Sequence, residues 1–145
     1  MRVDFYQLGH DTAAAALPLI ARAALKAGEK LLIVSDDSAM LGRIGDALWA
    51  RLPETFLAHG AAGGADEARQ PILLSDKPDP ANGAQFMAIA DGKWREGAQP
   101  FARTFYFFDQ AGLQEARDCW RSLGQRDGIA RHFWKQKDGK WVEGP

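Results

Sequence analysis

The sequence of 145 residues is long enough for one domain with its own core, and we expect residues 1–145 to form a single domain. Hydrophobic residues at 46% and charged residues at 26% are ordinary for a globular protein and exclude a largely disordered chain. The net charge of −1 argues against a protein that coats DNA, since such a protein needs a broad cationic face. Residues 117–145 nevertheless carry seven Lys and Arg against four Asp and Glu, so we expect a basic end on an acidic body.

Targeting and disulfide signals are missing from the sequence. No apolar run is long enough to span a membrane, and the first residues lack the charged start and apolar centre of a signal peptide. Cys119 is the only cysteine, and no activating base stands near it, so we expect a small buried thiol. These features predict a cytoplasmic protein without disulfides or membrane contact.

The chain is predicted to begin with a strand and a helix. Residues 3–8 alternate and are rich in β-forming side chains. Asp11 or Thr12 would cap the helix that follows, and Gly28 would end it. Pro18 requires that this helix either begin near it or bend there, because proline inside a helix removes a hydrogen bond.

A buried strand and a second helix are predicted next. Residues 31–34 are continuously apolar, which is typical of a strand covered on both faces in a parallel sheet. Asp36, Asp37 or Ser38 would cap the helix. Its core-facing residues follow 3-4-4 spacing: Leu41, Ile44, Leu48 and Leu52.

The rest of the chain is predicted to alternate short strands with loops and one further helix. Residues 60–70 are rich in Gly and Ala and indicate a mobile surface loop. Strands are expected at residues 71–75, 85–90 and 102–108, a helix at 110–124, and a short ribbon from 133–135 and 140–142. This order predicts an α/β fold, a Rossmann-like three-layer domain whose mostly parallel sheet has helices on both faces.

Two aromatic residues near residue 50 stand where burial is hard to explain. Trp49 lies on the flank of the second helix, off its apolar ladder, and Phe56 follows the Pro53 that stops the helix. Either both rings close the bottom of the core, or they form an exposed aromatic patch for a protein partner.

The last helix carries the second candidate binding surface. Leu113, Ala116, Trp120 and Leu123 fall at 3-4-3 spacing and form its apolar face, bordered by Arg117 and Arg121. Guanidinium groups beside an apolar seam suit an acidic peptide with a hydrophobic end. The alternative is a solvated basic helix edge.

Motifs for nucleotides, metals and catalysis are absent from the sequence. The first strand is followed by Gly9 alone, so the glycine-rich loop of a dinucleotide site is missing. The three histidines have no metal-ligand spacing, and no catalytic constellation or cofactor is predicted. The alternative function is a small nucleotide-binding domain or enzyme with a site at the strand ends around Gly9, Asp36 and Ser75.

Several motifs in order resemble one family. They are Gly-Glu-Lys before Leu-Leu-Ile-Val, Asp-Ala-Leu-Trp at 46–49, Pro-Glu-Thr-Phe-Leu-Ala-His-Gly at 53–60, Ala-Arg-Asp-Cys-Trp-Arg at 116–121, and Phe-Trp-Lys-Gln followed by Gly-Lys-Trp. Over nearly its whole length the chain resembles the chi subunit of bacterial DNA polymerase III, a Rossmann-like domain without the nucleotide loop.

The resemblance implies a non-catalytic accessory subunit of a DNA-directed DNA polymerase complex. Direct DNA binding through the basic end is a further alternative, but the acidic body predicts little direct nucleic-acid binding. Such a subunit links the clamp loader, through the psi subunit, to single-stranded DNA-binding protein, whose acidic C-terminal tail ends in apolar residues. By position, the resemblance implies tail binding by Arg117, Trp120 and Arg121. It implies a face for psi, or for another protein, at Trp49 and Phe56 with His59 nearby.

Overall fold

The computed structural model describes residues 1–9, 11–50, 58–95, 101–137 and 140–144. Its centre is an eight-stranded sheet with the order β3-β4-β2-β5-β6-β1-β7-β8. Every adjacent pair is parallel except β7 and β8, which are antiparallel. The strands are β1 Arg2–Gln7, β2 Leu31–Val34, β3 His59–Ala61, β4 Ile72–Ser75, β5 Phe86–Ile89, β6 Arg103–Phe108, β7 Ala130–Lys137 and β8 Lys140–Glu143.

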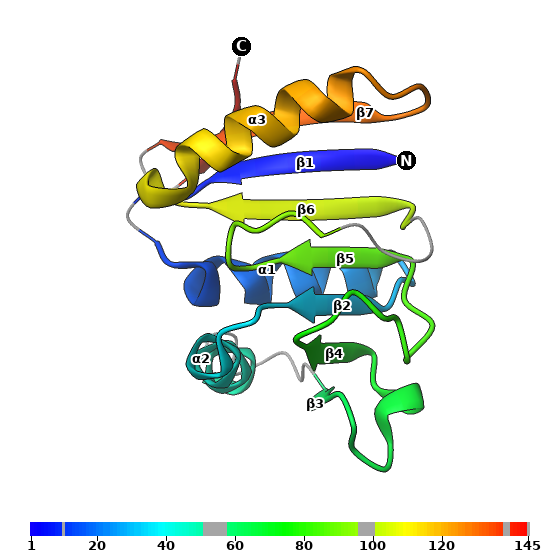
Figure 1. The fold of residues 1–145 in the computed structure, drawn as a ribbon. Helices are drawn as coiled ribbons and strands as arrows, with labels where there is room; N and C mark the ends of the chain where they lie inside the picture. Colours follow the sequence, from blue (N-terminus) through cyan, green and yellow to red (C-terminus); the bar gives the residue numbers. More distant parts are fainter. Residues whose placement is uncertain (10, 51–57, 96–100, 138–139, 145) are drawn as a thin grey trace.

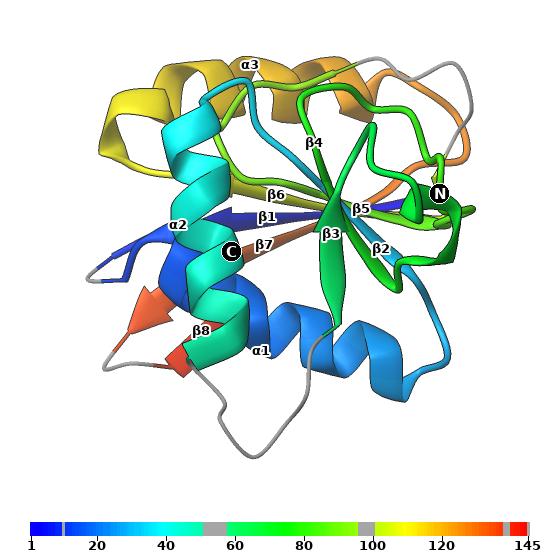
Figure 2. The same ribbon diagram turned by 90° about the horizontal axis from the view of Figure 1, so that it is seen from below.

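Helices cover both faces of the sheet, which confirms the predicted α/β, Rossmann-like architecture. Helices α1 (Ala13–Lys26) and α2 (Ser38–Ala50) pack on one face, and α3 (Leu113–Gly124) packs on the other. Figure 2 shows the sheet edge-on, with α3 on one side and α1 on the other. Strand β2 is buried on both faces, because Leu31 and Ile33 contact the α1 side while Leu32 and Val34 contact the α3 side.

Local sequence accounts for the helix boundaries. The Thr12 side chain caps α1 by accepting a hydrogen bond from the Ala15 amide, and Gly28, with φ of +81°, follows the helix end. Pro18 lies inside α1, so the helix begins before the proline rather than at it. In α2, Asp37 accepts hydrogen bonds from the amides of Ala39 and Met40, which confirms helix capping at this position.

Two regions differ from the sequence prediction. The stretch expected to be a loop at 60–70 contributes strand β3 at the edge of the sheet and a 3-10 helix, Glu67–Arg69. Three residues of β3 pair with β4, and so short a strand leaves no alternating pattern to detect. The ribbon expected at 133–142 is longer than predicted, and β7 pairs in parallel with β1 over Arg2–Gln7. The C-terminal segment is therefore part of the main sheet.

Candidate functional site: a pocket between α3 and β7

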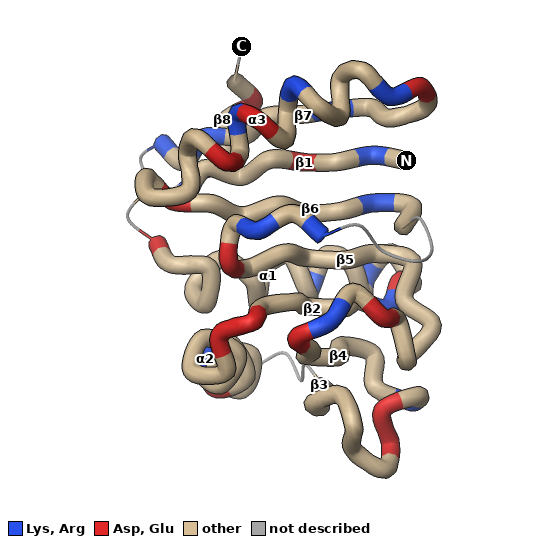
Figure 3. Tube along the Cα trace, in the orientation of Figure 1, with Lys and Arg blue, Asp and Glu red and all other residues tan. Residues whose placement is uncertain are grey.

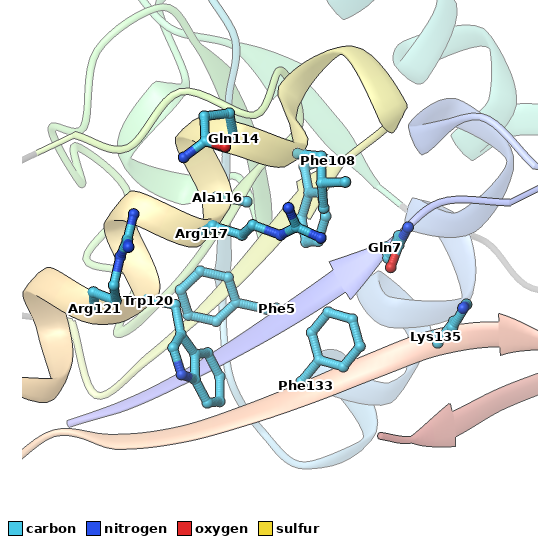
Figure 4. A pocket seen from close by; sticks show the side chains of 11 residues that line it. Phe5, Gln7, Phe108, Gln114, Ala116, Arg117, Trp120, Arg121, Phe133 and Lys135 are labelled. Carbon is cyan, nitrogen blue, oxygen red and sulfur yellow. The ribbon is translucent and has the colours of Figure 1, made fainter. Parts of the chain in front are cut away.

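A hollow in the described structure lies between α3 and the strands β1 and β7. Its volume is about 600 Å³. Figure 4 shows side chains from α3, β1, β6 and β7 converging on it. The lining residues are Phe5, Gln7, Phe108, Leu113, Gln114, Ala116, Arg117, Trp120, Arg121, Phe133 and Lys135. We call it the α3–β7 pocket.

Aromatic rings form the floor of the α3–β7 pocket. The Trp120 ring meets the Phe5 ring edge-on, with centroids 5.1 Å apart. The ring centroids of Phe108 and Phe133 lie 6.4 Å apart. Phe5 points to the α3 face because side chains alternate along β1, and its own ring is buried against Tyr106 at 5.1 Å. Trp120 is only partly buried, so the floor offers apolar surface to a ligand.

The rim of the pocket is cationic. Arg117 and Arg121 come from α3 and Lys135 from β7, and no Asp or Glu is among the lining residues. Figure 3 shows Lys and Arg on both α3 and β7. In Figure 4 the Arg117 side chain reaches over the aromatic rings, whereas Arg121 points away along the helix. Arg121 pairs with Asp118, one helical turn back.

A buried ion cluster ties the strands together on the opposite face. The Asp4 carboxylate on β1 is fully buried. It accepts hydrogen bonds from the side chains of Arg2 at 3.0 Å, Arg103 on β6 at 2.8 Å and Trp134 on β7 at 2.9 Å. Burial alone would raise the pKa of Asp4, but these donors outweigh it and hold the pKa below its usual value. The cluster fixes β1 relative to β6 and β7, the strands under the pocket.

A second hollow, which we call the strand-end pocket, lies where β1, β5 and β6 end. Its volume is about 350 Å³. Three carboxylates and a single cation line it: Asp11, Asp91, Asp109 and Arg43. Asp91 is held by two hydrogen bonds of 2.7 Å from Arg95, and these outweigh burial and lower its pKa. An excess of carboxylates repels phosphate groups, so this hollow is poorly suited to a nucleotide.

The residues of the predicted alternative site do not converge. Gly9 lines the strand-end pocket, but Asp36 and Ser75 do not. Asp36 forms an ion pair of 2.8 Å with Lys93, and the Ser75 hydroxyl accepts a hydrogen bond from the Lys77 amide. Both side chains thus have local partners.

Trp49 lies at the far side of the molecule from α3, near the end of α2. Its side chain is 52% exposed, and its ring centroid lies 4.5 Å from that of His59 on β3. Its ladder neighbours Ile44 and Leu48 are fully buried, as the helical spacing predicted. Phe56, the third residue predicted for this face, lies outside the described residues.

The structure thus brings Arg117, Trp120 and Arg121 together at one pocket and places Trp49 beside His59 at another surface. Sequence reasoning missed the strand residues of the α3–β7 pocket: Phe5, Gln7, Phe108, Phe133 and Lys135. Alternation alone would place Phe133 and Lys135 on one face of a strand. Nothing in the sequence indicated that this strand pairs with β1.

Other predicted features can be compared with the structure directly. Cys119 is buried, as expected for a small structural thiol. Among the described residues, no three His, Cys, Asp or Glu side chains form a group that could hold a metal ion. Within the same residues, no helix combines the length and apolar character needed to cross a membrane.

Comparison with known proteins supports the resemblance drawn from the motifs. The family model described as DNA polymerase III chi subunit, HolC matches residues 1–142. A search of curated proteins gives no match. The family match extends from β1 through β7 and into β8, and it includes all residues of the α3–β7 pocket. The chain belongs to the chi subunit family of DNA polymerase III.

Proposed function

We propose that the chain binds the acidic C-terminal tail of single-stranded DNA-binding protein in the α3–β7 pocket. The observation that carries this proposal is the combination of an aromatic floor with a rim of three cations and no lining carboxylate. An accessory role in the polymerase III assembly follows from membership of the chi family.

The two parts of the pocket match the two parts of such a tail. Its terminal apolar side chain would lie on the partly exposed Trp120 and Phe133, removing aromatic surface from water. Its carboxylates would be bound by Arg117 and Lys135, which face each other from α3 and β7. Arg121 would contribute less, because it already pairs with Asp118.

A second partner is proposed for the exposed Trp49. A large aromatic that is half exposed and stacked on His59 can anchor a protein interface. This surface lies at the β3–β4 end of the sheet, and the α3–β7 pocket lies toward the β7–β8 end (Figure 1). The separation would let one chain hold the psi subunit, or another protein, and the tail together.

Fluorescence anisotropy with a labelled acidic tail peptide tests the first proposal. The wild type is compared with Arg117→Ala/Arg121→Ala, and with Lys26→Ala as a control that removes an exposed cation from α1 on the opposite face. We expect binding that weakens with salt, is lost in the double variant and is unchanged in the control. A tail peptide without its terminal apolar residue should also bind weakly.

Two outcomes would reject the proposal. One is the absence of binding by a wild type that circular dichroism shows to be folded. The other is equal binding by the wild type and the double variant, which would place the peptide elsewhere.

The second proposal is tested by calorimetric titration with the psi subunit. Trp49→Ser should abolish psi binding while leaving tail binding unchanged, since the two surfaces are separate. Retained psi binding in this variant would show that Trp49 is not part of the interface.

A further inference from the structure

A residue outside the α3–β7 pocket holds one of its walls in place. The Arg131 guanidinium on β7 lies 4.3 Å from the centroid of the Trp120 ring, and its Nη1 donates a hydrogen bond of 2.7 Å to the Trp120 carbonyl oxygen. Arg131 does not line the pocket. Both contacts fix the same residue of α3.

Two different groups therefore contact the Trp120 ring. Phe5 meets the indole edge-on from β1, and Arg131 covers it with a cation from β7. A cation over an indole stabilises that ring position, more strongly when the pair is partly shielded from water. Among the described residues Arg131 forms no ion pair with a carboxylate, so its charge is directed to the indole and the carbonyl.

Gly124, the last residue of α3, provides room for this arrangement. A Cβ atom at position 124 would lie 2.7 Å from Arg131 Nη1 and 2.8 Å from its Cζ. The obstructed atoms are the end of a flexible side chain, and the backbone of Gly124 is helical. Alanine at this position would therefore displace the guanidinium while leaving the helix intact.

We propose that Arg131 is a positioning residue of the α3–β7 pocket, which orients Trp120 for the apolar end of the ligand, and that Gly124 makes this contact possible. The inference rests on the proposed tail binding. It predicts that moving the Arg131 guanidinium has the same effect on the pocket as removing it, although the two changes differ in charge.

The test compares tail-peptide affinities of Arg131→Ala, Gly124→Ala and the control Lys137→Ala, which removes an exposed cation from the same strand outside the pocket. Arg131→Ala and Gly124→Ala should each weaken binding about 3- to 10-fold, and the control should leave it unchanged. The salt dependence of the affinity should be the same in all variants, since Arg131 does not touch the peptide.

Repeating the Arg131→Ala change in a Trp120→Leu variant shows whether Arg131 acts by positioning Trp120 or by touching the peptide directly. In a protein that already carries Trp120→Leu, the added change Arg131→Ala should alter the affinity for the tail peptide by less than about 1.5-fold, because the indole through which Arg131 acts on the ligand is absent. Unequal effects of Arg131→Ala and Gly124→Ala, or an undiminished loss in Trp120→Leu, would overturn the inference.

A measurement without ligand distinguishes this inference from the proposed function. In protein labelled with 5-fluorotryptophan, the resonance assigned to Trp120 through Trp120→Phe should shift and broaden in Arg131→Ala and in Gly124→Ala, but not in Lys137→Ala. An unchanged Trp120 resonance would overturn the positioning role. If the resonance responds but the wild type binds no tail peptide, the proposed function fails and the positioning role stands.

Discussion

The α3–β7 pocket and the strand-end pocket meet at one residue of β6 but differ in the sign of their charge. Phe108 lines both, yet the first hollow has three cations on its rim and the second has three carboxylates with a single arginine. In open α/β sheets, ligands usually bind at the carboxyl ends of the strands. In this protein the chemistry for an anionic ligand lies instead on the face of the sheet, beneath α3.

The two hollows also differ in how their walls are supported. Asp4 joins three strands of the sheet below the α3–β7 pocket through donors from Arg2, Arg103 and Trp134. Asp91, at the strand-end pocket, is held by Arg95 four residues away in the same loop. The Asp36 amide also donates a hydrogen bond of 2.9 Å to Asp91, so the second network joins two loops, whereas the first joins three strands of the sheet.

The largest expected effect is the loss of folding stability when Asp4, the centre of the network that joins three strands, is replaced. Asp4→Asn should lower the free energy of unfolding by about 2–3 kcal/mol, since it leaves the guanidinium groups of Arg2 and Arg103 without their carboxylate. Both arginines reach solvent, which keeps the loss below that of a fully buried pair. Urea denaturation measures the decrease in the free energy of unfolding, and we expect a smaller decrease for Asp91→Asn. A larger decrease for Asp91→Asn than for Asp4→Asn would show that the Asp91 network stabilises the fold more than the Asp4 network does.

Acid should act on the same two carboxylates. The pKa of Asp4 and that of Asp91 are lowered in the folded protein, so both groups bind protons more readily when unfolded. Their contribution to stability is complete above the unfolded pKa of about 4 and is lost as the pH falls further. Urea denaturation between pH 6 and pH 2 should show this loss, and the loss should be smaller in Asp4→Asn. If the wild type and Asp4→Asn lose the same amount of stability in acid, the titration of Asp4 does not contribute to that loss.

Charge reversal at one cation of each hollow tests which of them binds the tail. Arg117→Glu should weaken tail-peptide binding about 30-fold, because it places a carboxylate over the aromatic floor. Arg43→Glu, at the strand-end pocket, makes the same change in net charge and should have almost no effect. Similar losses in both variants would indicate a general charge effect instead of a site.

A smaller effect is expected at the cation contributed by β7. Lys135→Ala should weaken binding about 3-fold, since an exposed lysine is a flexible point charge and orders less well than an arginine. The same anisotropy titration measures it, with Lys137→Ala as the control. A loss as large as that of Arg117→Glu would make β7 the main carboxylate-binding element.

The smallest expected effect concerns nucleotides. ATP with Mg²⁺ should leave the melting temperature unchanged, because the strand-end pocket presents mainly carboxylates to a phosphate. The tail peptide at 100 times its dissociation constant should stabilise the fold by about 2.7 kcal/mol. Stabilisation by ATP would favour the strand-end pocket as a binding site and remove the contrast between the two hollows.

Patterns within one element were predictable from the sequence, and pairings between distant elements were not. Helical spacing identified the buried Ile44 and Leu48 and placed Trp49 on the flank of the helix, since each depends on neighbours within two turns. It left open whether the Trp49 ring is buried or exposed. The same reasoning found Arg117 and Trp120 on α3. Lys135 was missed because its place in the pocket depends on the parallel pairing of β7 with β1.

Sequence reasoning was also limited where a contact depends on the absence of a side chain. In the sequence, Gly124 indicates only the end of a helix. That it leaves space for the Arg131 guanidinium is evident only when a Cβ atom is placed at position 124 in the structure. Asp4 reads as a polar position in a strand, although its partners Arg103 and Trp134 lie about a hundred residues or more along the chain.

The pairing of β1 with β7 has a consequence for the order in which the protein takes shape. Arg2 lies opposite Ala130, so this step closes a loop of most of the chain, a contact of high sequence separation that forms slowly. On the ribosome β1 is made well before β7. Until β7 arrives, one edge of β1 is open and Phe5 lacks its neighbour Phe133. The α3–β7 pocket is thus complete only once β7 has been made, and the proposed binding there would require a chain that extends through β7.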